Sequence, residues 1–314
     1  MRREPVIGIA LGGGAARGWA HIGVLEALRE RGVDPQVVSG ASIGALVGAA
    51  LAGGKLDELK TWVLDLRRLD VLKLLDASLG SGVITGNRVM RAIEDILTDR
   101  DIGDLDRPFG AVATDLHRGR TVWLREGSTI AAVRASCALP GLFPPVRRED
   151  SWLLDGGLVD PVQVTLCRML GADLVIAVNL SPYRHRLARQ LPASEPSHPA
   201  DTQENPEERS YLGRVHQYVQ GLFESGDAPV EREPALLDVM SSAINIMQER
   251  VARSRLAGDP PELEIVPDVQ DIGLMDFHRA ALAVQRGVEA VNNRTEEIAR
   301  LLPVKDSRIA APDG

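Results

Sequence analysis

Residues 6–18, with the sequence VIGIALGGGAARG, place a short apolar run directly before a glycine-rich loop. The run from Val6 to Leu11 ends at glycines, which is typical of a buried parallel strand. From Gly18 to Arg31, apolar residues fall on one helical face, and Gly32 predicts the end of that helix. The chain therefore begins with a strand, a glycine loop and a helix, which is the first unit of an α/β fold.

Short apolar runs and helical patterns alternate along the rest of the chain. Strands are predicted at residues 37–38, 109–114, 121–124, 152–154, 174–179 and 263–266. Helices are predicted at residues 42–52, 57–66, 87–97, 129–138, 162–170, 235–256 and 277–301. This alternation predicts a largely parallel sheet that is covered by helices on both faces.

The composition is that of an ordinary globular protein rather than of a nucleic-acid-binding or membrane-spanning one. The 314 residues include 44% hydrophobic and 25% charged residues, and the net charge is −8. A protein that binds nucleic-acid backbones would carry a basic surface, so no nucleic-acid partner is expected. No apolar stretch approaches the roughly 20 residues that a membrane span requires. We therefore expect a cytoplasmic protein whose contact with membranes, if any, is peripheral.

Two cysteines, Cys137 and Cys167, lie among small or apolar neighbours. This setting predicts buried free thiols in a reducing compartment. Cysteine or histidine pairs at the spacing of metal ligands are absent from the sequence, so we predict neither a metal site nor a cofactor. The oligomeric state stays open, with a homo-oligomer as one alternative.

The composition changes after residue 182. Residues 184–234 are rich in Pro, Glu, Arg, Ser and Gln, which predicts a mobile polar insertion. Within it, residues 211–223 (YLGRVHQYVQGLF) carry apolar side chains at helical spacing. Such a helix would either pack on the protein or on a partner subunit, or form an interfacial lid that contacts lipid. We predict one domain over residues 1–302 that contains this insertion, followed by a C-terminal tail at 303–314.

The sequence GASIG at residues 40–44 has a serine between two glycines at a predicted strand-to-helix turn. Gly40 and Gly44 would let a sharp turn form with the Ser42 hydroxyl exposed at its apex. A helix that starts at this point also directs free N–H groups and the positive end of its dipole towards a developing oxyanion. The pattern favours a serine nucleophile, and the alternative is a serine that only caps the helix.

The sequence GGGAARG at residues 12–18 follows the first predicted strand and lets backbone N–H groups approach a bound group closely. One alternative is a dinucleotide-binding loop, but Arg17 stands where the third glycine of that motif belongs. The second strand also ends in Ser39-Gly40, where that motif needs an acidic residue. A glycine loop beside a nucleophile is better explained as an oxyanion hole.

The sequence DGG at residues 155–157 follows the predicted strand at 152–154. An aspartate at the carboxyl end of a parallel strand projects into the crevice in which α/β sheets bind ligands. Asp155 is therefore a candidate for an acid–base role. The alternative is an ordinary Asp-Gly turn.

These three motifs, together with the sequence ASCALPGLFP at residues 135–144, resemble the patatin-like phospholipase family. The resemblance covers roughly residues 6–179 and is to serine acyl hydrolases of the bacterial patatin or neuropathy-target-esterase-like type. It implies a three-layer α/β/α sandwich with a mostly parallel central sheet. It also implies Ser42 as the nucleophile, Asp155 as the general base, and an oxyanion or substrate-binding site formed by Gly12, Gly13, Gly14, Ala15 and Ile43. The other motif positions are Arg17, Gly18, Gly40, Gly44, Gly156 and Gly157.

A Ser–His–Asp triad is the alternative to a Ser42–Asp155 dyad. His278 is the main candidate for its histidine, because α/β-hydrolases place that residue late in the chain. Here, however, the nucleophile follows the second predicted strand and the glycine loop follows the first, which favours the dyad. His278 is then expected on a helix surface.

The resemblance implies hydrolysis of fatty-acyl esters, such as phospholipids or lysophospholipids, through an acyl-enzyme and without a metal. A thioesterase or an acyltransferase on the same dyad is an alternative of the same broad class. A non-catalytic regulatory protein of this fold is a different alternative. The intact serine, aspartate and glycine loop argue against that last interpretation.

Overall fold

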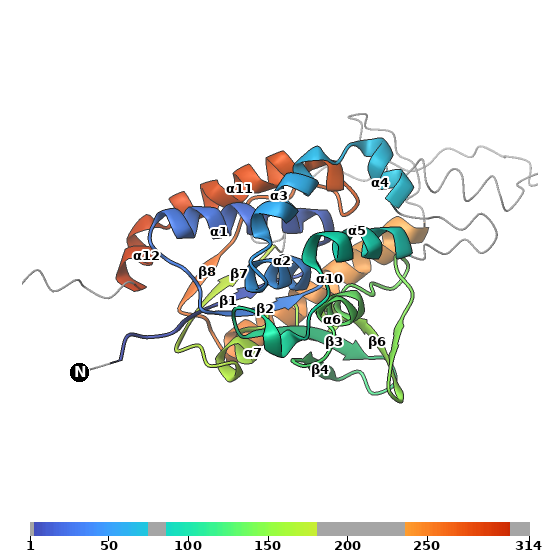
Figure 1. Cartoon of the computed structure of the whole chain (residues 1–314), viewed down its shortest axis with the longest axis horizontal. Coiled ribbons are helices and arrows are strands. Elements are labelled where there is room, and N and C mark those ends of the chain that lie inside the picture. The colour runs from blue at the N-terminus through green and yellow to red at the C-terminus, as the bar shows by residue number, and fades with distance from the viewer. Residues whose placement is uncertain (1–2, 75–85, 181–235, 302–314) are drawn as a thin grey trace, which may run out of the picture.

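The computed structural model describes residues 3–74, 86–180 and 236–301. The predicted insertion at 184–234, its apolar stretch at 211–223 and the predicted tail at 303–314 lie outside these residues. The described residues form a central sheet between two layers of helices (Figure 1). The expected α/β/α sandwich is confirmed, whereas the domain boundaries stay a prediction.

The described residues form a sheet of eight strands, in which successive pairings link β5-β6-β3-β2-β1-β7-β8, and β4 also pairs with β3. The strands are β1 (Ile7–Leu11), β2 (Val37–Ala41), β3 (Phe109–Asp115), β4 (Thr121–Leu124), β5 (Val146–Arg148), β6 (Ser151–Asp155), β7 (Leu174–Val178) and β8 (Leu263–Ile265). The pairs β1–β2, β1–β7, β2–β3 and β7–β8 are parallel. The pairs β3–β4, β3–β6 and β5–β6 are antiparallel, so the sheet is mostly parallel with an antiparallel part at one end.

Helices cover both faces of this sheet (Figure 1). The described α-helices are α1 (Ala20–Glu30), α2 (Ile43–Ala52), α3 (Leu56–Asp65), α4 (Arg68–Leu74), α5 (Asn87–Leu97), α6 (Thr129–Ser136), α7 (Val164–Met169), α10 (Leu236–Gly258), α11 (Ala280–Asn292) and α12 (Thr295–Leu301). Short 3₁₀ helices are η1 (Ala15–Trp19), η2 (Ile102–Asp104), η3 (Gly156–Leu158) and η4 (Phe277–Arg279). None of these described helices has the length and apolar character that crossing a lipid bilayer would need.

The alternation of side chains along β1 builds one hydrophobic core on each face of the sheet. Ile9 and Leu11 belong to a core that includes residues of α1, α2 and α11. Ala10, between them in the sequence, belongs to a second core with residues of α7 and α10. Because both faces are buried, β1 has a continuous apolar sequence instead of an alternating one.

Strand β3 brings together the two segments that carry Ser42 and Asp155. It pairs with β2 through residues 109–112 and with β6 through residues 113–115. It also pairs with β4 through residues 111–114. Residues 111–112 of β3 pair with both β2 and β4, and residues 113–114 pair with both β6 and β4. Because a strand has only two edges, β4 occupies one edge of β3, and β2 and β6 share the other. Because β2 and β6 run in opposite directions, their carboxyl ends meet on that edge.

The expectation that Asp155 ends a parallel strand is therefore wrong, because β6 is antiparallel to β3. An apolar run of three residues does not encode the direction of a strand. That direction follows from the pairing with β5 and β3, which depends on residues far apart in the chain. The carboxyl group still reaches the crevice, since β6 ends where β2 ends.

Three further elements differ from the sequence prediction. The helix predicted at 277–301 is divided into η4, α11 and α12. At the second break, the Thr295 hydroxyl donates to the Asn292 carbonyl at 2.8 Å, a local hydrogen bond that competes with the helical pattern. Helix α4 and strand β5 were not predicted, because seven and three residues are too few to show a clear hydrophobic period.

Candidate active site

Ser42 lies at a sharp turn between β2 and α2. Its backbone has φ 54° and ψ −127°, and a positive φ is rare and strained for a residue with a side chain. The Ser42 side chain makes no capping hydrogen bond to α2. The alternative of a serine that only caps the helix is therefore wrong, and the turn has the form of a nucleophile elbow.

Asp155 is buried at the end of β6, with 1% of its surface exposed. Its Oδ1 accepts a hydrogen bond from the Gly157 N–H at 2.8 Å, and its main-chain oxygen accepts one from the Thr114 hydroxyl at 2.7 Å. Its Oδ2 has no hydrogen-bond partner among the described residues. Burial raises the pKa of Asp155 to about 6, although the Ser42 hydroxyl and the Gly157 N–H oppose this shift. The carboxyl group is thus held in place with one oxygen available for a proton.

The register of the sheet brings Ser42 and Asp155 to neighbouring positions along β3. Ala41 pairs with Val112 of β3, and Asp155 pairs with the next residue, Ala113. Ser42 follows Ala41 directly, and its hydroxyl is close enough to lower the pKa of Asp155. No direct hydrogen bond joins the two side chains, since Oδ2 has no hydrogen-bond partner among the described residues. Catalytic hydrogen bonds are often long before substrate binds.

The glycine loop lies beside Ser42, but two of its N–H groups are already used. The Gly12 N–H donates to the Val178 carbonyl at 3.0 Å, and the Gly13 N–H donates to the Pro161 carbonyl at 3.1 Å. The expectation that Gly12 and Gly13 supply oxyanion donors is therefore wrong. Their N–H groups already have acceptors within the protein, as buried backbone groups require.

The available donors come from the end of the loop and from the start of α2. Among the residues that the structure describes, the N–H groups of Gly14, Ala15 and Ile43 have no hydrogen-bond acceptor. Ile43 begins α2, and the first N–H groups of a helix have no partner within it. Ala15 and Ile43 also line the pocket that contains Ser42. These three N–H groups are the candidates for an oxyanion hole.

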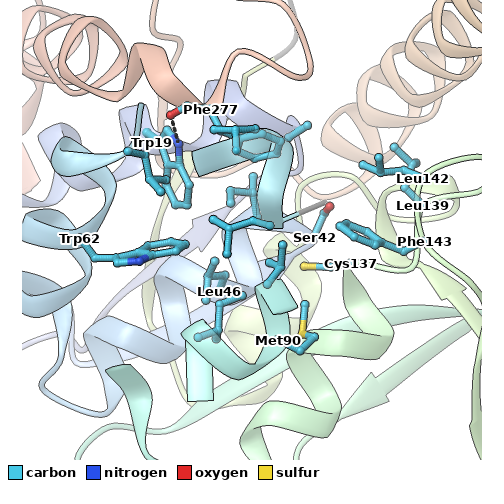
Figure 2. Close-up of a pocket in the computed structure, with 17 residues that line it drawn as sticks. Trp19, Ser42, Leu46, Trp62, Met90, Cys137, Leu139, Leu142, Phe143 and Phe277 are labelled. Atoms are coloured by element: carbon cyan, nitrogen blue, oxygen red, sulfur yellow. Dashed lines mark hydrogen bonds between the residues drawn. The ribbon is translucent and has the colours of Figure 1, made fainter. Parts of the chain in front are cut away.

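An apolar pocket contains the Ser42 side chain, which lies next to Cys137 (Figure 2). The pocket holds about 740 Å³ of empty space, including the part open to solvent. None of the described residues that line it is charged, and Ser42 is the only one of them with a hydroxyl. They are Ala15, Trp19, Ser42, Ile43, Leu46, Trp62, Leu66, Val71, Leu74, Val89, Met90, Ile93, Cys137, Leu139, Leu142, Phe143 and Phe277.

Comparison with known proteins assigns these motifs to a family. The family model described as patatin-like phospholipase matches residues 9–167, about half of the chain. The matched residues contain the glycine loop, Ser42 and Asp155. The chain belongs to the patatin-like phospholipase family. As a member of this family, it is an ester-hydrolysing enzyme that acts on lipids.

Relatives of this patatin-like phospholipase include full-length and partial matches. An "uncharacterized NTE family protein" of Mycobacterium tuberculosis is 34% identical over 334 residues, which cover 90% of this chain and 89% of that protein. Lysophospholipase nte1 of Emericella nidulans is 34% identical over 189 residues, which cover 55% of this chain and 12% of that protein. The crystal structure of VipD from Legionella pneumophila matches with a TM-score of 0.46 and 16% identity, over 96% of this chain and 89% of VipD. That last similarity is too distant to support an inference about this chain.

Two of the motif glycines in this patatin-like phospholipase let backbone segments pack closely. A Cβ at Gly18 would lie 2.1 Å from the Ile43 side chain, so η1 packs directly on the start of α2. A Cβ at Gly156 would lie 2.1 Å from the Val112 carbonyl, so η3 packs directly on β3. These glycines therefore support the site through packing.

Arg17 and His21 hold the glycine loop in place. The Arg17 Nε donates to the Ile272 carbonyl at 2.9 Å, and burial lowers the pKa of this guanidinium. His21 Nε2 lies 2.8 Å from the Gly12 carbonyl, and burial lowers the pKa of His21 to about 4. A neutral His21 must carry its proton on Nε2 to donate this bond. The sequence placed His21 inside the first helix but did not reveal this contact.

Within the described ranges, no histidine hydrogen-bonds to the two proposed catalytic residues. His278 lies in η4, where burial lowers its pKa, and the charged groups that act on it are Asp276, Arg68 and Arg279. The geometry therefore does not support a triad that includes His278.

The two cysteines occupy different environments, and both are free thiols. Cys167 is buried, as predicted, and burial raises its pKa. Cys137 is only partly buried and lines the pocket, which corrects the expectation of a buried core thiol.

Proposed function

We propose that this patatin-like phospholipase releases fatty acids from lipid esters through a Ser42–Asp155 dyad. The observation that carries the proposal is the register of β3, which aligns Ser42 and Asp155 beside an apolar pocket. Transfer of an acyl chain from water into such a pocket is favourable. The relative named lysophospholipase nte1 supports phospholipids or lysophospholipids as the substrate class.

In the first step, the Ser42 Oγ attacks the acyl carbonyl carbon, and Asp155 takes the hydroxyl proton. The negative charge develops on the carbonyl oxygen, which accepts hydrogen bonds from the N–H groups of Gly14, Ala15 and Ile43. The intermediate then expels the alcohol, which takes the proton from Asp155. The acyl group stays bound to Ser42 as an ester.

In the second step, a water molecule attacks the acyl-enzyme and gives a proton to Asp155. The new tetrahedral intermediate collapses, the Ser42 oxygen takes that proton back, and the fatty acid is released. A thioesterase would share both steps and differ in the leaving group. An acyltransferase would share the first step and use another acceptor in place of water.

A fluorophosphonate, which reacts with activated serines, tests the nucleophile. We expect intact-mass spectrometry to show one adduct on the wild type and none on Ser42→Ala, because the reagent bonds to the Ser42 Oγ. Ser151→Ala is the matched control, since Ser151 lies on β6 outside the pocket lining, and it should react like the wild type.

An adduct on Ser42→Ala would reveal another nucleophile and contradict the proposal. A folded wild type without an adduct, in buffer and with phosphatidylcholine vesicles, would contradict it too. Fatty-acid release from lysophosphatidylcholine and from palmitoyl-CoA, measured on the same preparation, separates an ester hydrolase from a thioesterase.

The activity is expected to rise with pH through about 6. Asp155 accepts a proton only when it is ionised, and burial raises its pKa to about 6. With a neutral soluble ester, kcat/KM should be roughly tenfold lower at pH 5 than on a plateau above pH 7. Asp160→Asn is the matched control, because burial raises the pKa of Asp160 to about 6 as well. The proposal fails if the profile is flat, or if Asp160→Asn removes its acid limb.

A further inference from the structure

The Ser136 hydroxyl holds the backbone of Ser42 at the elbow. Its oxygen accepts a hydrogen bond from the Ser42 N–H at 2.9 Å, and it donates to the Val112 carbonyl at 2.6 Å. Ser136 is fully buried, so bulk water cannot replace either bond. Val112 belongs to β3, the strand on which β2 and β6 meet. Ser136 thus ties the strained turn to the strand that aligns the dyad.

The two residues that follow Ser136 also contact the dyad. The Ala138 carbonyl accepts a hydrogen bond from the Asp155 N–H at 2.9 Å. Desolvation of the Cys137 thiol raises its pKa, and the charge of Asp155 adds to this shift, whereas the Ser42 hydroxyl opposes it. Ser136, the last residue of α6, therefore bonds to Ser42, and Ala138, two residues later, bonds to Asp155.

We propose that Ser136 is a positioning residue that keeps Ser42 aligned with Asp155. The proposal rests on the dyad of the proposed function. The positive φ of Ser42 is strained, and such a conformation persists only where surrounding contacts hold it. Without the Ser136 hydroxyl, the Ser42 N–H and the Val112 carbonyl both lose a partner. The turn can then relax, which moves the Ser42 hydroxyl away from Asp155.

This role is separate from oxyanion stabilisation. The Ser42 N–H already donates to Ser136, so it is not one of the donors assigned to the oxyanion. Ser136 is also absent from the described residues that line the pocket, so it does not contact an acyl chain there. Its loss should therefore affect the chemical step more than substrate binding.

Thr129→Val is the matched control for Ser136→Ala. Thr129 lies at the start of the same helix, is buried, and donates its hydroxyl to the Arg100 carbonyl at 2.7 Å. Each substitution removes a hydrogen bond that the hydroxyl of a buried residue donates to a carbonyl, and Ser136→Ala also removes the acceptor of the Ser42 N–H. Of the two hydroxyls, only that of Ser136 bonds to Ser42.

The test measures kcat and KM on p-nitrophenyl butyrate, the rate of fluorophosphonate labelling, and the midpoint of thermal unfolding. Ser136→Ala should lower kcat and the labelling rate by roughly tenfold to a hundredfold, because a small displacement of a reacting group has that effect. Its KM should change by less than about twofold. Thr129→Val should keep kcat within about twofold of the wild type even where its unfolding midpoint falls equally.

Unchanged kcat and labelling in Ser136→Ala would overturn the proposal. Equal losses of activity in both variants would also overturn it, because they would indicate general destabilisation. If Ser136→Ala does not fold, Ser136→Cys replaces it, since a thiol is a weaker donor and acceptor than a hydroxyl. Labelling of Ser136→Cys at the wild-type rate would then refute the role. Failure of the proposed function would give a different result. In that case the fluorophosphonate would still label Ser42→Ala, or it would not label the wild type.

Discussion

Asp155→Asn is expected to lower kcat by roughly 10³- to 10⁴-fold while the protein stays folded. Asparagine has the shape of aspartate, and its Oδ1 can still accept the hydrogen bond that Gly157 donates at 2.8 Å. The amide cannot take the Ser42 proton, so the nucleophile is no longer activated. Measurement of kcat on a soluble ester and slow fluorophosphonate labelling would show this loss. Turnover near the wild-type value would refute the dyad.

The same variant should be more stable than the wild type at alkaline pH. Burial raises the pKa of Asp155 from 3.8 to about 6, so ionisation of this carboxyl is less favourable in the folded chain than in the unfolded one. Above pH 6 this difference destabilises the fold by roughly 2–3 kcal/mol, and below 3.8 it disappears because both states are protonated. Asparagine removes the effect.

Thermal unfolding followed by circular dichroism at pH 8 and at pH 5 measures this gain. The midpoint of Asp155→Asn should exceed that of the wild type at pH 8, and the gain should shrink at pH 5. A variant that loses both activity and stability would instead indicate a structural aspartate. Activity lost with stability gained is typical of a residue that is strained for function.

Gly44→Ala is expected to lower kcat by at least roughly a hundredfold and to destabilise the fold by roughly 1–3 kcal/mol. A Cβ at Gly44 would lie 1.9 Å from the Leu11 carbonyl oxygen and 2.7 Å from the Gly12 carbonyl oxygen. Both obstacles are backbone atoms, so α2 would have to move away from the end of β1. Ser42 and the Ile43 N–H would move with it.

Gly48→Ala is the matched control for this prediction. Gly48 lies one turn further along α2, and its Cβ would meet side-chain atoms of Val38 at 3.0 Å and of Phe109 at 3.1 Å. Small movements of these side chains can accommodate a methyl group, and alanine favours the helix by roughly 1 kcal/mol over glycine. Gly48→Ala should keep kcat near the wild-type value. Equal kcat values in the two variants would show that the close contact of α2 with the end of β1 is not needed for catalysis.

The sequence by itself determined the parts of the molecule that depend on neighbours in the chain. The apolar run of β1 predicts a strand buried on both faces, and α5 has the predicted bounds, Asn87–Leu97. The glycines on either side of Ser42 predict its sharp turn, because only residues without side chains let the strand and the helix approach so closely. Each family motif likewise consists of residues that are close together in the chain.

Only the tertiary structure decided which groups are free to react. The direction of β6, the occupied N–H groups of Gly12 and Gly13, and the contacts of Ser136 all depend on partners distant in sequence. The Gly12 N–H, for example, donates to the Val178 carbonyl, which lies beside it because β1 pairs with β7 in parallel. A hydrogen bond needs a specific atom at a specific distance, and a local pattern contains no information about that distance. The sequence therefore predicts which residues form the site, whereas the tertiary structure decides which of their groups donate, accept or hold the site in place.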